Sequence, residues 1–305
     1  ALLANNKVVP ENPLTLKITA QGGVGTAQEH DFLIKHYGLD SVGWGTPFLL
    51  VPEATTVDDD TRKKLLKAKE KDLYLSNVSP LGIPFNNLRD TSKDLEKQKK
   101  VEIGNPGSPC PRKYLALTRE YDEKGICTAS RLYQKNKITE KGISNEITDK
   151  VCLCMGLAAS SIINNKIKTK ESKGVSVCPG PNMAYFDNVL SLDQMTKHIY
   201  GVENFMSRDD RPNMFIKELN LYVDFLTNKF EEAKKDWNKS QKKYFNQFVV
   251  NLTDGITYYD NLFEQLKDKF EQTKDETLLG LENMKNKLAL FSKELEKLNL
   301  IPSSS

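Results

Sequence analysis

Apolar residues recur every three or four positions over the last third of the chain, a spacing typical of helices that pack together. The clearest stripe consists of Leu281, Met284, Leu288, Phe291, Leu295 and Leu298. Two similar stripes precede it, at Leu219, Tyr222, Val223, Leu226 and Phe230 and at Tyr244, Phe245, Phe248 and Leu252. The sequence therefore predicts a helical, coiled-coil-like domain over residues 183–305, built from two or three long antiparallel helices. Residues 251–255 are predicted to form a turn between two of them.

Residues 1–100 show a different pattern, in which short apolar runs alternate with segments that suit helices. Residues 16–19 and 41–44 are predicted strands, and residues 26–37 between them present one apolar helical face. A further helix is predicted over residues 61–71, followed by an extended run at 74–78. This order predicts an α/β fold with parallel strands.

Both predicted strands run into glycines, with Gly22 and Gly23 after the first strand and Gly45 and Thr46 after the second. A backbone without Cβ lets several N–H groups close around an anion. In a (β/α)₈ barrel the carboxyl ends of the strands form the active-site face, and the last two loops commonly hold a phosphate. The pattern therefore favours the end of a phosphate-binding barrel.

Four segments of this region together resemble the C-terminal end of the flavin-dependent nitronate monooxygenases, a family of FMN-binding barrels. The family's A-x-G-G-I-x-T and G-T-x-F loops are matched by Ala20-Gln-Gly-Gly-Val-Gly-Thr26 and Gly45-Thr-Pro-Phe48. An acidic stretch and short helix follow at residues 52–55 and 65–70, and an S-x-x-G-x-P-x-x-x-L-R segment at residues 79–89. The resemblance covers roughly the first 90 residues.

The resemblance implies that the backbones of Gly22, Gly23, Gly45 and Thr46 hold the phosphate of FMN. The family's catalytic histidine lies in earlier strands that have no counterpart here, so no catalytic residue is assigned. Two βα units cannot close a barrel, so we expect the remaining strands to come from another subunit or from a longer precursor. Arg89 is expected to secure a loop or, as the alternative, to reach a phosphate or substrate acid. Trp44 is expected in the barrel core or beside the flavin.

Residues 101–182 form a region rich in Cys, Gly and Pro, in which every cysteine lies beside Pro, Gly or another small residue. Tight turns of that kind point thiolates toward a common point, as in an iron–sulfur cluster or a structural zinc site. The predicted ligands are Cys152, Cys154 and Cys178, with Cys110 or Cys127 as the fourth. Two alternatives remain open, namely small buried residues in loops and a redox-active pair of Cys152 and Cys154.

Composition limits the cellular compartment and the classes of partner that we expect for the chain. Of 305 residues, 28% are charged and 38% are apolar, and the net charge of +3 is too balanced to suggest a nucleic-acid partner. No apolar run reaches transmembrane length, so no membrane partner is expected. Five cysteines without a signal peptide predict a cytoplasmic protein with reduced or metal-bound thiols. The lysine-rich segments 63–71 and 93–100 are expected to be solvated helix faces.

Two classes of function are consistent with these patterns. The first is an FMN-dependent oxidoreductase, a nitronate monooxygenase-like flavoprotein acting on a small-molecule substrate, of which this chain supplies the phosphate-binding loops. The second is a non-catalytic metal-binding or scaffold protein that acts through its helical arm, because apolar seams serve partner binding as readily as self-packing. The paired glycine loops favour the first.

Overall fold

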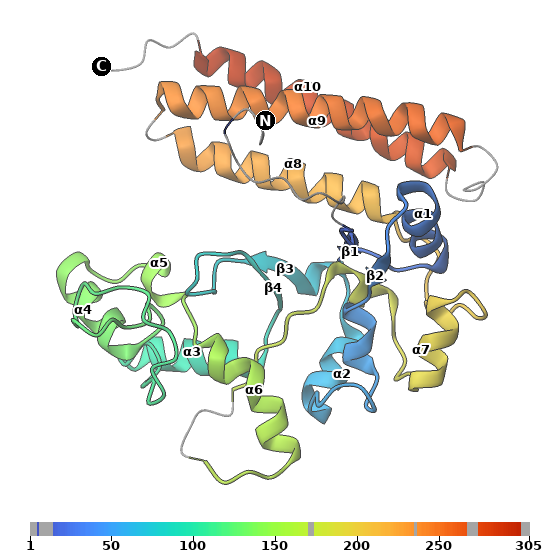
Figure 1. Cartoon of the computed structure of the whole chain (residues 1–305). Helices are drawn as coiled ribbons and strands as arrows, with labels where there is room; N and C mark the ends of the chain where they lie inside the picture. Colours follow the sequence, from blue (N-terminus) through green and yellow to red (C-terminus); the bar gives the residue numbers. More distant parts are fainter. Residues whose placement is uncertain (1–4, 6–14, 170–173, 235–236, 267–273, 300–305) are drawn as a thin grey trace. The chain divides into compact units, whose positions relative to one another are not determined.

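A computed structural model of the chain describes residue 5 and residues 15–169, 174–234, 237–266 and 274–299 (Figure 1). The chain divides into two compact units, Ala1–Arg208 and Asp209–Ser305. The boundary that the sequence predicts after residue 182 therefore lies between Arg208 and Asp209 instead. The physical reason is that residues 183–208 supply Met183, Phe186 and Met195 to the core of the first unit.

Strands occur as two separate pairs in the first unit (Figure 1). β1 (Thr19–Gln21) and β2 (Ser41–Gly43) are parallel and are connected by α1 (Ala27–Tyr37). β3 (Leu73–Ser76) and β4 (Phe85–Leu88) form an antiparallel hairpin. The predicted β-α-β order is thus present, and the fold is mixed α/β and rich in helix. The barrel is not seen, because the described strands form only these two two-stranded sheets.

Helices make up most of the remaining regular structure of the first unit. They are α2 (Asp59–Lys67), α3 (Ser92–Glu102), α4 (Arg131–Lys141), α5 (Asn145–Thr148), α6 (Leu153–Asn164) and α7 (Leu192–Ile199). Within residues 15–208 as far as the structure describes them, 3₁₀ turns accompany the helices at η2 (Thr46–Leu50), η3 (Glu70–Asp72) and η4 (Pro181–Tyr185). The region predicted to be irregular and rich in cysteine therefore contains α4, α5 and α6, joined by loops.

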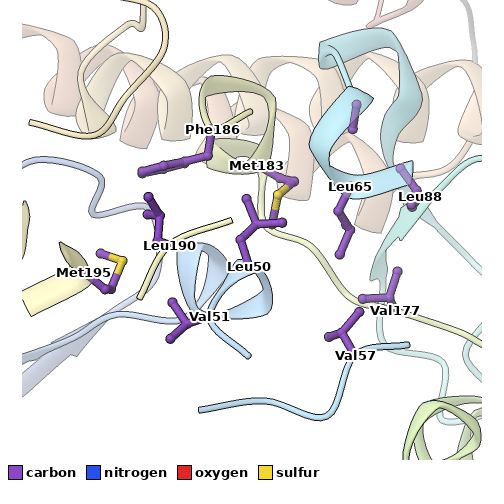
Figure 2. Packing of buried hydrophobic residues seen from close by; sticks show 11 residues of the cluster. Leu50, Val51, Val57, Leu65, Leu88, Val177, Met183, Phe186, Leu190 and Met195 are labelled. Atoms are coloured by element: carbon purple, nitrogen blue, oxygen red, sulfur yellow. The ribbon is translucent and has the colours of Figure 1, made fainter. Parts of the chain in front are cut away.

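The core of the first unit gathers apolar side chains from segments far apart in the sequence (Figure 2). Its buried members include Leu50 of η2, Leu65 of α2, Leu88 of β4, Met183 of η4 and Met195 of α7. Each such side chain contributes on the order of 2 kcal/mol through apolar area removed from water. The core therefore fixes η2 and η4 against each other, which positions the loops described below.

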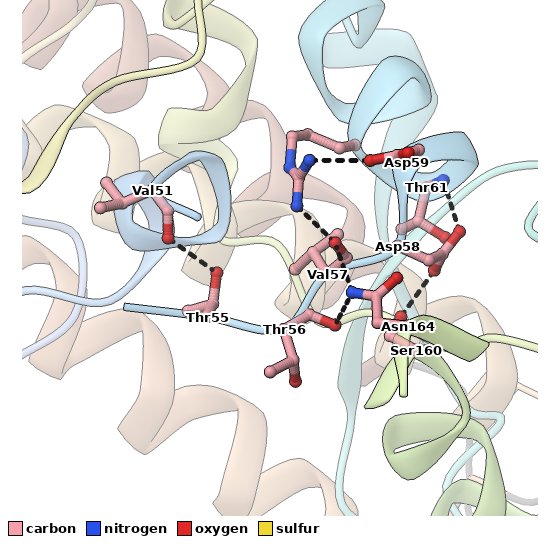
Figure 3. Close-up of polar contacts among 10 residues, drawn as sticks. Val51, Thr55, Thr56, Val57, Asp58, Asp59, Thr61, Ser160 and Asn164 are labelled. Atoms are coloured by element: carbon pink, nitrogen blue, oxygen red, sulfur yellow. Dashed lines mark hydrogen bonds and ion pairs between the residues drawn. The ribbon is translucent and has the colours of Figure 1, made fainter. Parts of the chain in front are cut away.

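A polar cluster joins α2 to α6 (Figure 3). Asp58 accepts the backbone N–H of Thr61 at 3.0 Å as the N-cap of α2, and it accepts the hydroxyl of Ser160 at 2.6 Å. Burial raises the pKa of the Asp58 carboxyl, but these hydrogen bonds lower it, and the net pKa lies below the ordinary value. Asn164 donates to the backbone oxygen of Thr56 at 3.1 Å. These bonds hold together segments about a hundred residues apart.

The second unit consists of three long helices that all contact one another, α8 (Met214–Ala233), α9 (Lys239–Gln265) and α10 (Lys274–Asn299) (Figure 1). The predicted seam is confirmed, since Leu281, Met284, Leu288, Phe291 and Leu295 are all buried. The turn predicted at residues 251–255 is wrong, because α9 continues through Gly255. The apolar period carried by Leu252 and Ile256, both buried, overrides the local turn signal.

Aromatic rings fill the centre of this bundle. Phe230 packs edge-on against Phe245 and Phe291, with ring centroids 5.3 and 4.7 Å apart. At one end, Asn213 accepts the N–H groups of Phe215 and Ile216 as the N-cap of α8 and donates to the Thr277 hydroxyl at 2.5 Å. The apolar side chains of the seam thus pack against one another among the three helices of the bundle.

Candidate functional site

The glycine loops lie at the carboxyl ends of neighbouring parallel strands. The register pairs Gln21 with Gly43, so Gly22 follows the last residue of β1 and Gly45 lies two residues after the end of β2. Neighbouring strands run about 4.8 Å apart, and parallel strands end at the same edge of their sheet. The structure therefore brings the two predicted phosphate-binding loops together.

The first loop has two glycines in the left-handed conformation, and each loop has open space beside one glycine. Gly22 and Gly23 have φ angles of +94° and +76°, in the left-handed region that favours glycine. A Cβ added at Gly22 or at Gly45 would meet no atom within 4 Å, and both residues are exposed. The space beside Gly22 and Gly45 is therefore compatible with the close approach of an anion to the backbone.

The carbonyl groups of the first loop are held on its inner side by buried side chains of two other elements. Asn182 of η4 donates to the backbone oxygens of Gly23 at 2.9 Å and of Val24 at 3.0 Å. His198 of α7 contacts the backbone oxygen of Gly25 at 3.0 Å. In a trans peptide the N–H points opposite to the C=O. The N–H groups that follow these carbonyls therefore point away from Asn182 and His198.

The tautomer of His198 follows from the hydrogen bonds of its two ring nitrogens. The backbone N–H of Phe205 donates to Nδ1 at 3.2 Å, so Nδ1 accepts and the proton resides on Nε2, which donates to the oxygen of Gly25. The rings of Trp44 and Phe186 lie edge-on to this imidazole, with centroids 5.6 and 5.4 Å away. His198 is thereby a buried, neutral support of the loop.

A carboxylate already binds two N–H groups of the first loop. Glu29 is buried and accepts the N–H of Gly25 at 2.8 Å and of Thr26 at 3.3 Å, while Thr26 caps the start of α1. A phosphate would therefore use donors nearer the strand ends. Those are the positions Gly22, Gly23, Gly45 and Thr46 that the resemblance implies.

The second loop is covered by a segment that the sequence did not mark as part of this site. A Cβ at Gly180 would lie only 2.2 Å from Oγ1 of Thr46, so a larger residue at position 180 would require the Thr46 side chain to move. Gly180 and Asn182 belong to the stretch Pro179-Gly-Pro-Asn182, which signals a turn. Nothing in that stretch alone indicates which loop the turn contacts.

Trp44 and Arg89 have structural contacts. Trp44 follows β2, is half-buried and donates from Nε1 to Nδ1 of His30 at 3.0 Å. Arg89 donates to the backbone oxygen of Lys71 at 2.9 Å and lies 4.4 Å above the ring of Tyr74. Arg89 thus holds the turn η3 that precedes β3, and it also borders an open cleft of about 350 Å³ lined by residues of both charge signs.

Four of the five cysteines border one small cavity. Cys110, Cys127, Cys152 and Cys154 line a space of about 20 Å³ together with apolar residues and Arg112. Three predicted ligands are therefore brought together and joined by Cys127, which the sequence offered only as an alternative. Cys178 is exposed and is not among the lining residues. Its neighbours turn toward the core, as buried Val177 shows, which leaves the Cys178 thiol outside the cavity.

Burial governs the protonation of these thiols. It raises the pKa of Cys127 to about 11 and also raises the pKa values of Cys110 and Cys154. The backbone N–H of Ala129 donates to Sγ of Cys127 at 3.4 Å. Among the described residues, no three His, Cys, Asp or Glu side chains already stand in the arrangement of metal ligands.

Comparison of the chain with protein-family models, with curated proteins and with solved structures finds no match. Within the part of the chain that the structure describes, no helix is both long and apolar enough to cross a membrane.

Proposed function

We propose that this chain supplies the phosphate-binding loops of an FMN-dependent oxidoreductase similar to the nitronate monooxygenases. The observation that carries the proposal is the pairing of β1 with β2, which brings Gly22 and Gly45 to one sheet edge with open space beside both. Asn182 and His198 support it, because their hydrogen bonds to Gly23, Val24 and Gly25 fix the segment that directly follows Gly22.

The roles of the chain's own residues follow from their contacts. The amides of Gly22, Gly23, Gly45 and Thr46 would bind the phosphate, and Gly180 allows its segment to lie close to the Thr46 side chain. A bound flavin would supply the redox chemistry, while the protein supplies binding and orientation. No residue of the chain is assigned as a catalytic base or to a particular substrate.

The scaffold alternative receives less support from the second unit. The apolar residues of its seam are buried among α8, α9 and α10, so they are not exposed for contact with a partner protein. Of the two earlier stripes, Val223, Leu226, Phe230, Phe245 and Leu252 are buried as well, whereas Tyr222 and Tyr244 are exposed.

A comparison of FMN with riboflavin tests the proposal, because riboflavin lacks only the phosphate. We expect flavin fluorescence titrations of the full chain to show at least about 10-fold tighter binding of FMN, a difference of about 1.4 kcal/mol. Gly45→Asp should remove this preference, because it adds a negative charge where the phosphate would lie. Gly45 has a φ of −126°, so a side chain there is not forced into the left-handed region.

Two variants complete the design. Gly45→Asn has the shape of the aspartate without its charge, and Thr139→Asp adds the same charge on an exposed position of α4. We expect the order of FMN affinity to be wild type and Thr139→Asp, then Gly45→Asn, then Gly45→Asp. Equal affinity for FMN and riboflavin, or no binding of FMN by the folded chain, would contradict the proposal.

A further inference from the structure

We propose that the second unit pairs with a second copy of this chain through an aromatic face on α8 and α9. The residues of this aromatic face are Tyr222, Phe225 and Lys229 of α8 and Tyr244, Phe248 and Gly255 of α9. The face is distinct from the buried seam of the bundle and belongs to the second unit, so the proposal does not depend on flavin binding. Three observations carry it: exposed aromatic rings, open space at a glycine, and opposite charges near the two ends.

On α8, the residues of the aromatic face follow a helical spacing. Tyr222, Phe225 and Lys229 are separated by three and four positions, which returns to the same side of an α-helix. Glu218 lies four positions before Tyr222 and interacts with its hydroxyl, which raises the pKa of Tyr222. Tyr222 is 45% exposed, whereas its neighbour Val223 is buried. The tyrosine ring therefore lies outside the core of the bundle.

Ring contacts join this stripe to α9. The rings of Phe225 and Phe248 have centroids 6.0 Å apart, and Nζ of Lys229 lies 4.7 Å from the ring centroid of Tyr244. Tyr244 is exposed, and Phe225 and Phe248 are half-buried. Exposed rings that gather on one face are typical of protein–protein contacts, in which tyrosine is enriched. The two neighbouring helices thus present a strip of aromatic side chains (Figure 1).

Gly255 provides space on the same side of α9. It lies seven positions after Phe248, which is about two helical turns. Among the described residues, no atom other than those of its own helix backbone and chain neighbours lies within 4 Å of a Cβ added there. A side chain of a second copy is therefore able to approach the backbone of α9 closely at this position.

Charges near the two ends of the face point to a second copy as the partner. Glu218 and Lys229 are eleven positions apart, about 16 Å along α8, so they do not pair within one chain. On α9 the same interval separates Lys243 from Asp254. Lys243 lies beside the Tyr244 that Lys229 contacts, and α9 runs antiparallel to α8. Both helices therefore have a lysine toward one end of the face and an acid toward the other.

Two-fold symmetry brings these opposite charges together. In an isologous pair of antiparallel α8 helices, Glu218 of each copy lies opposite Lys229 of the other, with the aromatic rings between them. Two helices from each copy would then form a four-helix arrangement. Two helices over a length of about 20 Å offer an area at the low end of specific interfaces, so we expect a weak dimer.

Sedimentation velocity of the full chain without flavin tests the pairing. We expect a monomer–dimer equilibrium with a Kd on the order of 10 μM. Tyr222→Glu should raise this Kd at least about 10-fold, because it places a charge among aromatic rings. Leu290→Glu is the matched control, since Leu290 is 65% exposed on α10 and lies outside the aromatic face, and its Kd should stay unchanged.

A charge exchange tests the two-fold arrangement. Glu218→Lys and Lys229→Glu should each raise the Kd at least about 5-fold, because like charges then lie opposite each other. The double variant should return to within about 3-fold of the wild-type Kd, since both contacts re-form with reversed sign. Circular dichroism checks each fold, and Glu218→Lys leaves the contact of Lys229 with Tyr244 in place.

Three results would overturn the proposal. The first is a chain that stays monomeric at every concentration, which would leave the aromatic face to a different protein. The second is a dimer that Tyr222→Glu does not weaken. The third is a double variant that associates no more tightly than the two single variants.

Discussion

The two units of this protein build their cores in different ways. In the second unit, three helices of 20 to 27 residues bury one continuous seam of apolar side chains. In the first unit, the core is assembled from short elements, and buried polar bonds such as those from Asn182 to Gly23 and from His198 to Gly25 join residues more than 150 positions apart. This difference indicates which of the two units has backbone groups that a ligand can bind. Backbone groups held in loops are open to a ligand, whereas helical backbone groups bond one another.

The largest expected effect tests the internal seam of the second unit. Leu288 is 4% exposed, and Leu288→Asp places a charge among apolar side chains. We expect the free energy of unfolding to fall by about 4 kcal/mol or more, measured by denaturant titration and circular dichroism. Leu290→Asp is the matched control, because Leu290 is 65% exposed on the same helix. A Leu288→Asp protein of unchanged stability but altered oligomeric state would show that the seam is an interface.

The next effect tests the close loop packing of the first unit. A Cβ at Gly107 would lie 2.8 Å from Cα and N of Arg131, and Gly107 has a φ of +78°. Gly107→Ala should therefore cost about 3 kcal/mol, since strain and overlap combine. Gly104 has a similar φ of +69° but no atom within 4 Å of an added Cβ, so Gly104→Ala should cost only about 1 kcal/mol. Equal losses in thermal melts would mean that loop contacts at Gly107 are looser than described.

A smaller effect concerns the charge of Asp58, which lies in the first unit. Its pKa in the folded protein is below the ordinary value, so its contribution to stability is complete above the unfolded pKa and is lost as the pH falls through the folded pKa. Asp58→Asn keeps an N-cap residue but removes the charge. We expect a loss of about 1.5 kcal/mol near neutral pH that disappears in acid. A constant difference between the two proteins across the acidic range would contradict this role.

The smallest effect is a gain in the second unit. Gly255 lies inside α9 with no atom within 4 Å of an added Cβ, so Gly255→Ala should stabilise the bundle by about 0.8 kcal/mol. At Gly280 of α10 the same change would place Cβ 3.1 Å from Ile216, and we expect a smaller gain or a loss. Thermal melts of the two variants would measure this difference. An equal gain in both would show that α8 and α10 can separate slightly.

Local periodicity explains why much of the fold is predictable. The seam from Leu281 to Leu295 and the β-α-β order around Gly22 and Gly45 depend on neighbouring residues, and both are found in the structure. The prediction of a turn at residues 251–255 is wrong, because an Asp-Gly pair signals a turn only where the apolar period stops.

Contacts between distant segments explain what the sequence could not reveal. The sequence predicts Lys93 on a solvated face, yet it is 4% exposed, because residues 174–176 cover it and its N–H donates to the oxygen of Val175. In the same way, no local pattern assigns Asn182 to the glycine loop. Whether Cys127 or Cys178 borders the cavity of the other three cysteines likewise depends on how three loops fold back together.

Hydrogen exchange measured by mass spectrometry tests the central claim, that the loops of the first unit bind a phosphate. The full chain is compared with and without FMN, and with riboflavin as the reference. We predict that FMN slows exchange in peptides covering residues 22–26 and 44–48, that riboflavin does so less, and that peptides of α9 and α10 exchange unchanged. Protection confined to the second unit, or equal protection by riboflavin, would contradict the account.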